Sequence, residues 1–366
     1  MNTMMSRVTG FLYRNILKRI LFLFPADDVH QFFLTLGRWF GRSSIVKRIT
    51  AWLWRYDEKI LERKFFDLTF PNPVGLSAGF DYGADLVDIM PSIGFGFNTV
   101  GTLTHDAYEG NPPPMLGRLP KSKSLLVNKG FKNDGVKTVL NRMGNKVREA
   151  PRGVSIGATN KAYPDFESMI TNLVEGFRDA EQFDNFDYYE LNISCPNLIN
   201  LQNLKTLLAS PEGLTQALKQ LQTLAIKRPV FIKMPLEYTQ NEMDDLMAVA
   251  STFTFIKGLI FSNLARDRSN PFFDKDEILL AGQGNFSGKP AEEKANEMLR
   301  HARELYPDRF LLVGVGGIFT AEDAYKKILC GASLVQMITG MVFMGPQQIG
   351  EINAGLAELL RRDRSK

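Results

Sequence analysis

The sequence predicts a (β/α)8 barrel, an α/β fold, with an N-terminal amphipathic helical extension. After about residue 65, short apolar, β-branched runs alternate with helical stretches, and eight such units favour one closed barrel over an open sheet. The expected strands lie near residues 73–78, 96–101, 153–157, 188–193, 229–234, 256–262, 310–315 and 333–338. Polar candidates follow several of these strands, where barrel enzymes keep their chemistry. We therefore expect a helical region over residues 1–60 and a barrel over residues 61–366.

The first sixty residues carry a different pattern from the rest of the chain. Apolar residues over 11–24 recur at helical spacing with basic residues between them, and Pro25 ends this helix. A second apolar-rich helix begins at about Asp28, and a third basic segment runs over 45–54. No run reaches the roughly 18 uncharged residues of a membrane span, and no cleavage site of a signal peptide follows. Such helices suit a membrane interface, and they could equally cover the bottom of the barrel.

Composition excludes several classes of protein. The 366 residues are 44% hydrophobic and 23% charged, as in an ordinary globular protein. A net charge of +4 is too small to argue for a nucleic-acid partner. Two cysteines give no disulfide framework, and for Cys330, late in an expected helix over 321–330, we favour a packing role. With only three histidines, no metal site is expected.

Residues 191–197, Leu-Asn-Ile-Ser-Cys-Pro-Asn, place a thiol between two carboxamides at the end of an apolar strand. A sulfur that can accept a proton, flanked by Asn192 and Asn197, suits the oxidation of a flat, amide-bearing substrate, because carboxamides can pair with ring N–H and C=O groups. Cys195 is therefore a candidate base. Taken alone, the motif fits a buried cysteine beside a turn better. The motifs around it reverse that preference.

Two further features point to a ligand site. Gly316 and Gly317 follow an apolar strand, and a second strand comes after one amphipathic helix, so this is the late position at which barrels often hold a phosphate. Lys233 ends the apolar strand over 230–232, and lysine is almost never buried unpaired. It could serve a cofactor, or it could form a Schiff base as in an aldolase-type barrel.

With these motifs in view, the chain resembles the dihydroorotate dehydrogenase family from about Ile16 to the final helix. Several rare strings in the right order carry the resemblance: residues 72–81, 94–102, 109–112, 192–197, 286–290 and the glycine pair. The segment over 16–30 resembles the N-terminal helices of the membrane-associated, quinone-using class 2 enzymes, which form a tunnel to the flavin. The resemblance thus implies a peripheral protein on the cytoplasmic face of the cell membrane, or on an organellar inner membrane in a eukaryote.

The resemblance also implies a reaction and its residues. Dihydroorotate would be oxidised to orotate for pyrimidine biosynthesis, with FMN as cofactor and membrane quinone as acceptor. Cys195 would remove the C5 proton while a hydride passes from C6 to flavin N5, and Lys233 would stabilise the reduced flavin. Four asparagines would bind the substrate ring: Asn192, Asn197, Asn263 and, with a one-residue shift in the motif, Asn128. The cofactor would be bound by Ala78, Gly79, Thr102, Lys233, Ser262, Gly288, Gly316, Gly317, Ile338 and Thr339.

The chain departs from the family pattern at several positions. The class 2 pattern has a serine where this chain has Cys195, which resembles the soluble class 1 enzymes. A family lysine that contacts flavin and substrate is replaced by Tyr82. Leu198 stands in place of a family threonine and Gln202 in place of an arginine. Leu264 replaces a second threonine, and Ile338 replaces a tyrosine. These departures leave open a related FMN oxidoreductase acting on another pyrimidine or an enone, a Schiff-base lyase, and a catalytically idle membrane-bound binding protein.

Overall fold

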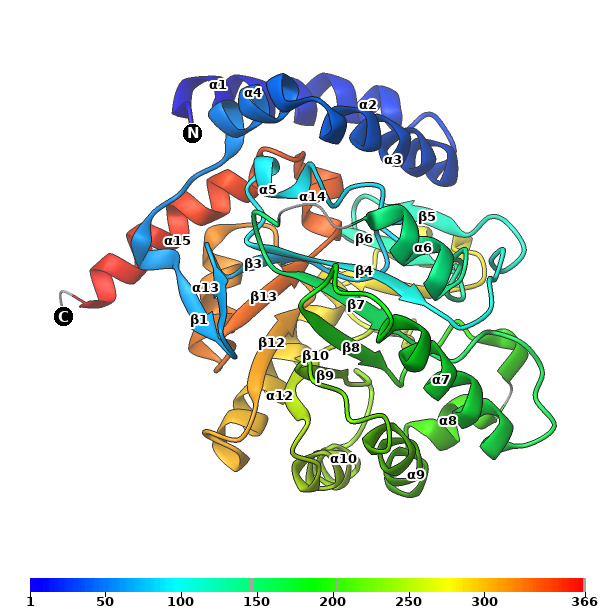
Figure 1. Cartoon of the computed structure of the whole chain (residues 1–366). Coiled ribbons are helices and arrows are strands. Elements are labelled where there is room, and N and C mark those ends of the chain that lie inside the picture. The colour runs from blue at the N-terminus through cyan, green and yellow to red at the C-terminus, as the bar shows by residue number, and fades with distance from the viewer. Residues whose placement is uncertain (145–147, 202, 365–366) are drawn as a thin grey trace.

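The computed structural model describes residues 1–144, 148–201 and 203–364. Within these residues, eight parallel strands close into a barrel in the order β10-β12-β13-β3-β4-β7-β8-β9 (Figure 1). The strands are β3 (Val74–Leu76), β4 (Phe97–Leu103), β7 (Arg152–Ile156), β8 (Tyr188–Asn192), β9 (Val230–Lys233), β10 (Ile256–Phe261), β12 (Leu311–Val315) and β13 (Leu334–Met337). Each lies in or beside its expected range, so the predicted fold class is confirmed. The departure at Gln202 lies outside the described residues.

Helices surround the barrel and cover the apolar outer faces of its strands. The longer ones are α6 (Val136–Met143), α7 (Phe166–Ala180), α9 (Pro211–Gln222), α10 (Gln240–Thr252), α12 (Glu292–Leu305), α13 (Ala321–Leu329) and α15 (Gln348–Arg364). Short helices α5 (Met90–Ile93), α8 (Leu204–Leu208), α11 (Lys275–Leu280) and α14 (Thr339–Met344) fill the connections. Helices α10 and α13 begin with capping boxes at Thr239 and Thr320, which satisfy their first backbone N–H groups. Cys330 caps α13 and is buried, in keeping with the packing role expected for it.

A hairpin of two short strands closes the bottom of the barrel. It consists of β1 (Arg63–Phe65) and β2 (Leu68–Phe70). The ring of Phe70 packs edge-on against Phe97, with centroids 5.5 Å apart, and Tyr188 stacks on Phe231 at 5.3 Å. These aromatic residues lie at or near the starts of β4, β8 and β9, so the hairpin covers the N-terminal ends of the strands. The alternative in which the N-terminal helices cover the bottom is therefore wrong.

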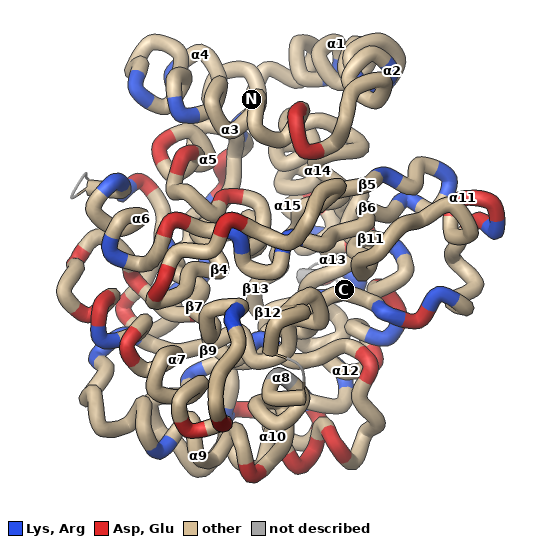
Figure 2. The backbone as a smooth tube through the Cα atoms, turned by 90° about the vertical axis from the view of Figure 1, so that its right-hand side faces the viewer, with Lys and Arg blue, Asp and Glu red and all other residues tan. Residues whose placement is uncertain are grey.

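The N-terminal helices lie as a separate layer over the opposite end of the barrel (Figures 1 and 2). They are α1 (Thr3–Leu12), a π-helical turn (Tyr13–Leu17), α2 (Lys18–Leu21), α3 (Ala26–Arg42) and α4 (Ser44–Trp54), followed by a 3-10 turn (Lys59–Leu61). The first helix starts earlier than residue 11, because the Asn2 side chain caps it by accepting from Met5 N. Pro25 ends that segment as predicted. The boundary at residues 60 and 61 stays a prediction.

Between the helical layer and the barrel lies a small antiparallel sheet that the sequence did not predict. It contains β5 (Leu116–Leu119), β6 (Ser124–Val127) and β11 (Asn285–Gly288), in the order β11-β6-β5. The Asp27 carboxylate of α3 accepts hydrogen bonds from the backbone N–H groups of Met115 and Leu116, both at 3.0 Å. At a second point, the Tyr13 hydroxyl donates to Val342 O at 2.7 Å. The helical layer is thus joined to the barrel by polar anchors.

In the part of the chain described, no helix is long and apolar enough to cross a membrane.

Candidate active site

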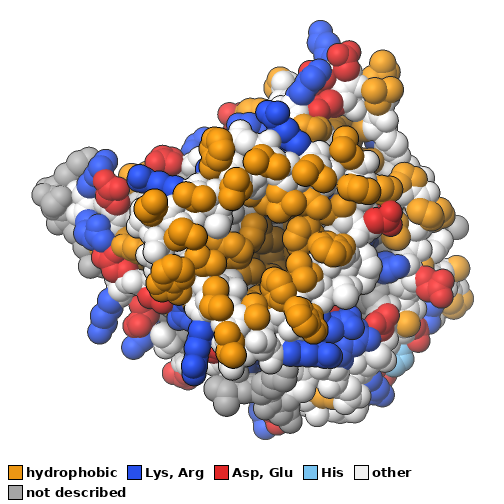
Figure 3. Space-filling view, turned by 90° about the horizontal axis from the view of Figure 1, so that it is seen from above, with side chains coloured by type: hydrophobic (Ala, Val, Ile, Leu, Met, Phe, Trp, Pro, Cys, Tyr) orange, Lys and Arg blue, Asp and Glu red, His pale blue; other side chains and the backbone are white. Residues whose placement is uncertain are grey.

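One cavity of about 380 Å³ lies at the C-terminal ends of the barrel strands and continues between the N-terminal helices. Viewed from above, the molecule is hollowed at the centre of a field of hydrophobic side chains (Figure 3). Among the residues described, Asn128 is the predicted site residue that does not line this cavity. The following predicted residues all line it: Ala78, Gly79, Thr102, Asn192, Cys195, Asn197, Lys233, Ser262, Asn263, Gly288, Gly316, Gly317, Ile338 and Thr339.

Side chains at the ends of four strands hold one another in fixed orientations. Asn192 donates to the Thr102 hydroxyl at 3.0 Å, and Asn263 donates to Asn192 Oδ1 and to Ser194 Oγ, both at 3.1 Å. Ser194 in turn donates to the backbone carbonyl of Lys233 at 3.0 Å. Because these bonds cross between β4, β8, β9 and β10, the carboxamides are oriented before any ligand arrives.

Asn111 forms a second set of amide contacts behind the cavity wall. Its Nδ2 donates to Asn128 Oδ1 and to Asn197 O, both at 2.9 Å. Its Oδ1 accepts from the Tyr108 hydroxyl at 2.7 Å and from Asn160 Nδ2 at 3.1 Å. Asn128 therefore reaches the site through Asn111, and its direct contact with a ligand stays a prediction. The sequence did not indicate a role for Asn111, although this residue lies in the 109–112 string that carried the family resemblance.

Lys233 brings a charge into the centre of the site. Its side chain is only 6% exposed, and its Nζ donates to Ser77 Oγ at 3.3 Å. Burial lowers the pKa of Lys233, and the charges of Glu190 and Cys195 act in the opposite direction. Glu190 is itself buried below the cavity, where it accepts hydrogen bonds from Thr99 Oγ1 and Gln336 Nε2, both at 2.6 Å. The lysine is thus surrounded by groups that can stabilise its ammonium form.

Part of the cavity wall is bare backbone. A Cβ atom added to Gly79, whose φ is +107°, would find only the Ile338 side chain within 4.0 Å, so the backbone of Gly79 faces open space. Gly317 has a φ of +76°, and an added Cβ would lie 2.4 Å from Glu292 Cβ, so only glycine fits there. The hydroxyl of Ser262 is buried without a hydrogen-bond partner in the described structure. Glycine backbone lets a flat cofactor approach the wall closely, and the Ser262 hydroxyl can bond a polar edge of that cofactor. Both features fit a flavin.

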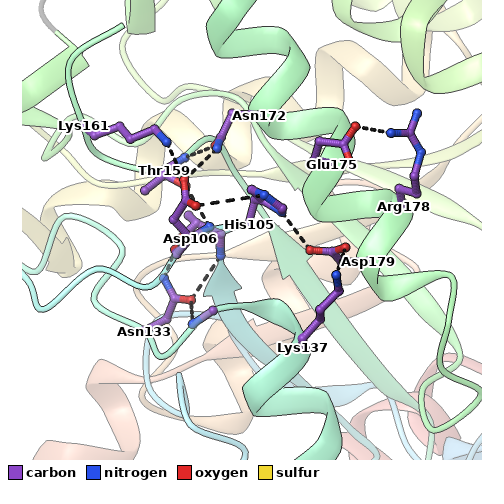
Figure 4. Close-up of polar contacts among 12 residues, drawn as sticks. His105, Asp106, Asn133, Lys137, Thr159, Lys161, Asn172, Glu175, Arg178 and Asp179 are labelled. Carbon is purple, nitrogen blue, oxygen red and sulfur yellow. Dashed lines mark hydrogen bonds and ion pairs between the residues drawn. The ribbon is translucent and has the colours of Figure 1, made fainter.

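A polar cluster outside the cavity positions the loop that follows β6 (Figure 4). His105 Nδ1 lies 2.7 Å from Asp179 Oδ2, and Lys137 Nζ lies 2.9 Å from the other oxygen of that carboxylate. Close by, Asn133 donates to the Thr104 hydroxyl at 2.8 Å and accepts from Thr104 N. These contacts tie the end of β4 to α6, to α7 and to the loop after β6. None of these five residues lines the cavity, so we assign the cluster a positioning role.

Four of the family departures line the cavity, namely Cys195, Tyr82, Leu264 and Ile338, and a fifth, Leu198, does not. Tyr82 lines the cavity, and Lys129 Nζ lies 4.9 Å from the centre of its ring. Leu264 also lines it, whereas Leu198 is buried among the residues around it. An ammonium group is therefore present beside position 82 although the family lysine is absent there.

The fold and the cavity together define a barrel enzyme with a cofactor-sized site at the strand ends. A family model described as Dihydroorotate dehydrogenase matches residues 60–360. The chain belongs to this family, as its motifs indicated, and its predicted membership of the quinone-dependent class 2 is confirmed. Enzymes of the family depend on a flavin.

Relatives named dihydroorotate dehydrogenase (quinone) match along almost the whole chain. The protein of Brucella ovis is 35% identical over 360 residues, which cover 96% of this chain and 93% of the relative. That of Christiangramia forsetii is 33% identical over 352 residues, 95% of this chain and 99% of the relative. The crystal structure of DHODH from Eimeria tenella in complex with ferulenol has a TM-score of 0.79 at 24% identity and covers 93% of this chain and 92% of its own, which shows the shared fold.

We predict that Asn111→Ala lowers the free energy of unfolding by at least about 2 kcal/mol, because it leaves several buried partners of Asn111 without hydrogen bonds. Denaturant unfolding monitored by circular dichroism measures the change. Asn241→Ala, at an exposed position of α10, is the control and should change the stability by less than about 0.5 kcal/mol. Equal effects of the two substitutions would contradict the role of Asn111.

Proposed function

We propose that this protein oxidises dihydroorotate to orotate, a step of pyrimidine biosynthesis, and passes the electrons to a quinone. The observation that carries the proposal is a continuous cavity, which joins Cys195, Lys233 and the asparagines at the strand ends to an apolar compartment between the helices. A polar reactant and an apolar one can therefore reach the same buried centre. The names of the relatives, which specify dihydroorotate dehydrogenase with quinone, support the same reaction.

The flavin is FMN in this proposal. When bound, it accepts a hydride from the substrate and supplies electrons to the quinone. The backbone at Ala78, Gly79, Gly288, Gly316 and Gly317 would lie against it, with the two last glycines beside its phosphate. Hydroxyl and ammonium groups that line the same cavity would bond its polar edge: Thr102, Lys233, Ser262 and Thr339. Ile338 would pack against it beside Gly79.

Cys195 is the proposed base. Its thiol is buried at the cavity, near enough to Lys233 for the two charges to interact. A thiolate beside an ammonium group can take the C5 proton of the substrate without a relay, whereas a serine hydroxyl would have to pass the proton onward. Asn192, Asn197 and Asn263 orient the substrate ring. The interlocked hydrogen bonds of Asn192 and Asn263 hold these donors in place for that task.

The other functions considered from the sequence have less support. A Schiff-base lyase would need Lys233 to react with a carbonyl, but the family to which the chain belongs uses a flavin. A related oxidoreductase for another pyrimidine or an enone would rest on Tyr82 and Leu198. The names of the relatives, which specify dihydroorotate, favour the proposed substrate over another pyrimidine or an enone.

We further infer peripheral association with a membrane through the helical layer, on the cytoplasmic face or on an organellar inner membrane. Large apolar side chains project from its outer surface, among them Leu23 at 82% and Trp39 at 67% exposure. Lysine and arginine side chains lie around the apolar field that surrounds the hollow (Figure 3). An apolar face with a basic rim suits the boundary between lipid headgroups and acyl chains. A quinone dissolved in the bilayer could then enter the cavity directly.

Protein purified without added cofactor should show the absorption spectrum of an oxidised flavin, and mass spectrometry of the released compound should identify FMN. Anaerobic dihydroorotate should bleach that spectrum. A colourless preparation that also takes up no FMN in a titration would exclude the proposed cofactor and return the Schiff-base lyase to consideration.

Cys195→Ala should slow flavin reduction by dihydroorotate by about two to four orders of magnitude, the usual effect of removing a positioned base, while FMN stays bound. Cys195→Ser should be intermediate. Rapid-mixing measurements of flavin bleaching test this, with Cys330→Ala as a matched cysteine control that keeps the parent rate. If Cys195→Ala bleaches as fast as the parent, Cys195 is a packing residue.

The double variant Leu23→Glu, Trp39→Glu should bind anionic phospholipid vesicles at least tenfold more weakly than the parent, because it places charges on the apolar face. Parent binding should weaken with added salt, since the basic rim is screened. Vesicle co-sedimentation measures both effects. Leu329→Glu, an equally drastic change on the exposed side of α13, is the control and should bind like the parent. Parental binding by the double variant would refute the inferred membrane face.

A further inference from the structure

The apolar half of the cavity contains one group of titratable side chains, at the point where α3 meets the barrel. Asp27 and His30 lie three residues apart on α3, and Tyr82 and Lys129 reach the same place from two barrel loops. His30, Tyr82 and Lys129 line the cavity. The surrounding helical walls consist mainly of Val, Leu and Phe side chains. This concentration of titratable groups beside apolar helical walls requires an explanation beyond packing.

Lys129 is the centre of this group. Its side chain is almost buried, its Nζ lies 3.5 Å from Asp27 Oδ1, and the same atom lies 4.9 Å from the centre of the Tyr82 ring. The other oxygen of Asp27 is held by the backbone N–H groups of Met115 and Leu116. The carboxylate is therefore fixed, and it keeps the ammonium group at the cavity wall.

His30 complements the lysine as an acceptor. Its Nε2 lies 2.8 Å from Phe80 O and must donate to that carbonyl, so Nδ1 carries the lone pair. In the described structure, Nδ1 is buried and has no hydrogen-bond partner. Burial, and secondarily the Lys129 charge, lowers the pKa of His30 to about 4. The passage thus presents one fixed proton donor, Lys129, and one neutral acceptor, His30.

The proposed reaction needs such a donor, and the inference rests on that reaction. A quinone becomes a quinol by taking up two electrons and two protons. A hydride delivered by the reduced flavin carries two electrons and one proton, so the second proton must come from elsewhere. Because Lys233 is proposed to stabilise the reduced flavin as an anion, the flavin itself has no second proton to give.

We propose that Lys129 is the acid that protonates the quinone oxygen during reoxidation of the enzyme. The N–H bond of the Lys129 ammonium breaks as the O–H bond of the quinol forms, and the hydride completes the reduction. The neutral amine is then reprotonated from solvent, to which the Lys129 side chain keeps 10% exposure, while Asp27 holds it in place. His30, a neutral residue that lines the same cavity, lies beside this donor.

Other titratable groups near this place are less suited to the task. Burial raises the pKa of Tyr82 to about 12, and that of Tyr13 to about 12, so both hydroxyls hold their protons tightly. Arg118 cannot donate at neutral pH, and its guanidinium is occupied by Phe24 O at 2.8 Å. Lys132 adds a second positive charge near Lys129. Burial, helped by Lys132 and opposed by Asp27, lowers the pKa of Lys129 from 10.5 to about 8, which is close to that of an efficient acid at neutral pH.

Rapid mixing of the full-length holoenzyme separates the two halves of the reaction. In Lys129→Met, flavin reduction by dihydroorotate should keep the parent rate, whereas reoxidation by decyl-benzoquinone should slow by roughly two orders of magnitude. The parent reoxidation rate should fall above pH 8, and that of the variant should not change there. Lys129→Arg keeps the charge but cannot release a proton, so it should be as slow as Lys129→Met. Lys121→Met is the matched control, because this lysine is exposed and lies in the turn between β5 and β6.

A second measurement needs neither substrate nor catalysis. Since the folded protein binds the Lys129 proton less tightly than the unfolded chain, unfolding takes up a proton between pH 8 and 10.5. This group therefore makes the folded state more stable as the pH rises through that window. The melting temperature of the parent, relative to that of Lys129→Met, should increase over the same range.

The outcomes distinguish the possibilities. Parental reoxidation by Lys129→Met, or full rescue by Lys129→Arg, would overturn the proposal, because the first removes Lys129 from the step and the second shows that its charge suffices. A melting-temperature difference that does not change with pH would also overturn it. Failure of dihydroorotate to bleach the flavin of the parent would instead reject the proposed function itself.

Discussion

The burial of the Lys233 ammonium group is the constraint around which the centre of the barrel is arranged. A charge this far from water is stable only if nearby groups replace its hydration. Ser77 accepts from it, Cys195 lies close enough to interact, and Glu190 supplies a carboxylate one layer below. Glu190 in turn depends on Thr99 and Gln336 for hydrogen bonds. The charge of Lys233 on β9 thereby connects Ser77, which follows β3, with polar side chains of β4, β8 and β13.

This arrangement divides the barrel into two ends with different physical character. At the bottom, aromatic rings pack without a gap, and the β1–β2 hairpin seals them. At the top, amide side chains and bare glycine backbone leave space instead of filling it. The stability of the lower half allows the upper half to hold polar groups that are not fully satisfied, such as the hydroxyl of Ser262.

The sequence predicted the barrel because its strands are buried on both faces and therefore appear as continuous apolar runs. It predicted the polar and glycine residues at the strand ends because they follow those runs directly. It did not predict the role of Asn111 or Lys129, since their partners come from other elements, such as Asp27 of α3 for Lys129. The strands β5, β6 and β11 were missed because each is only four residues long and because β11 pairs with a strand far from it in the sequence. The early start of α1 depended on one capping side chain, Asn2.

The apolar walls of the helical half of the cavity also determine how the proposed reactants would be sorted. A dihydroorotate anion would lose its hydration along a passage lined by residues such as Phe33 and Leu36, whereas a quinone would lose almost none. The polar half of the cavity thus suits a hydrated reactant, and the apolar half suits a lipid-soluble one. In the proposed function, the chain would separate its reactants by solubility, and the flavin would lie where the polar half of the cavity meets the apolar half.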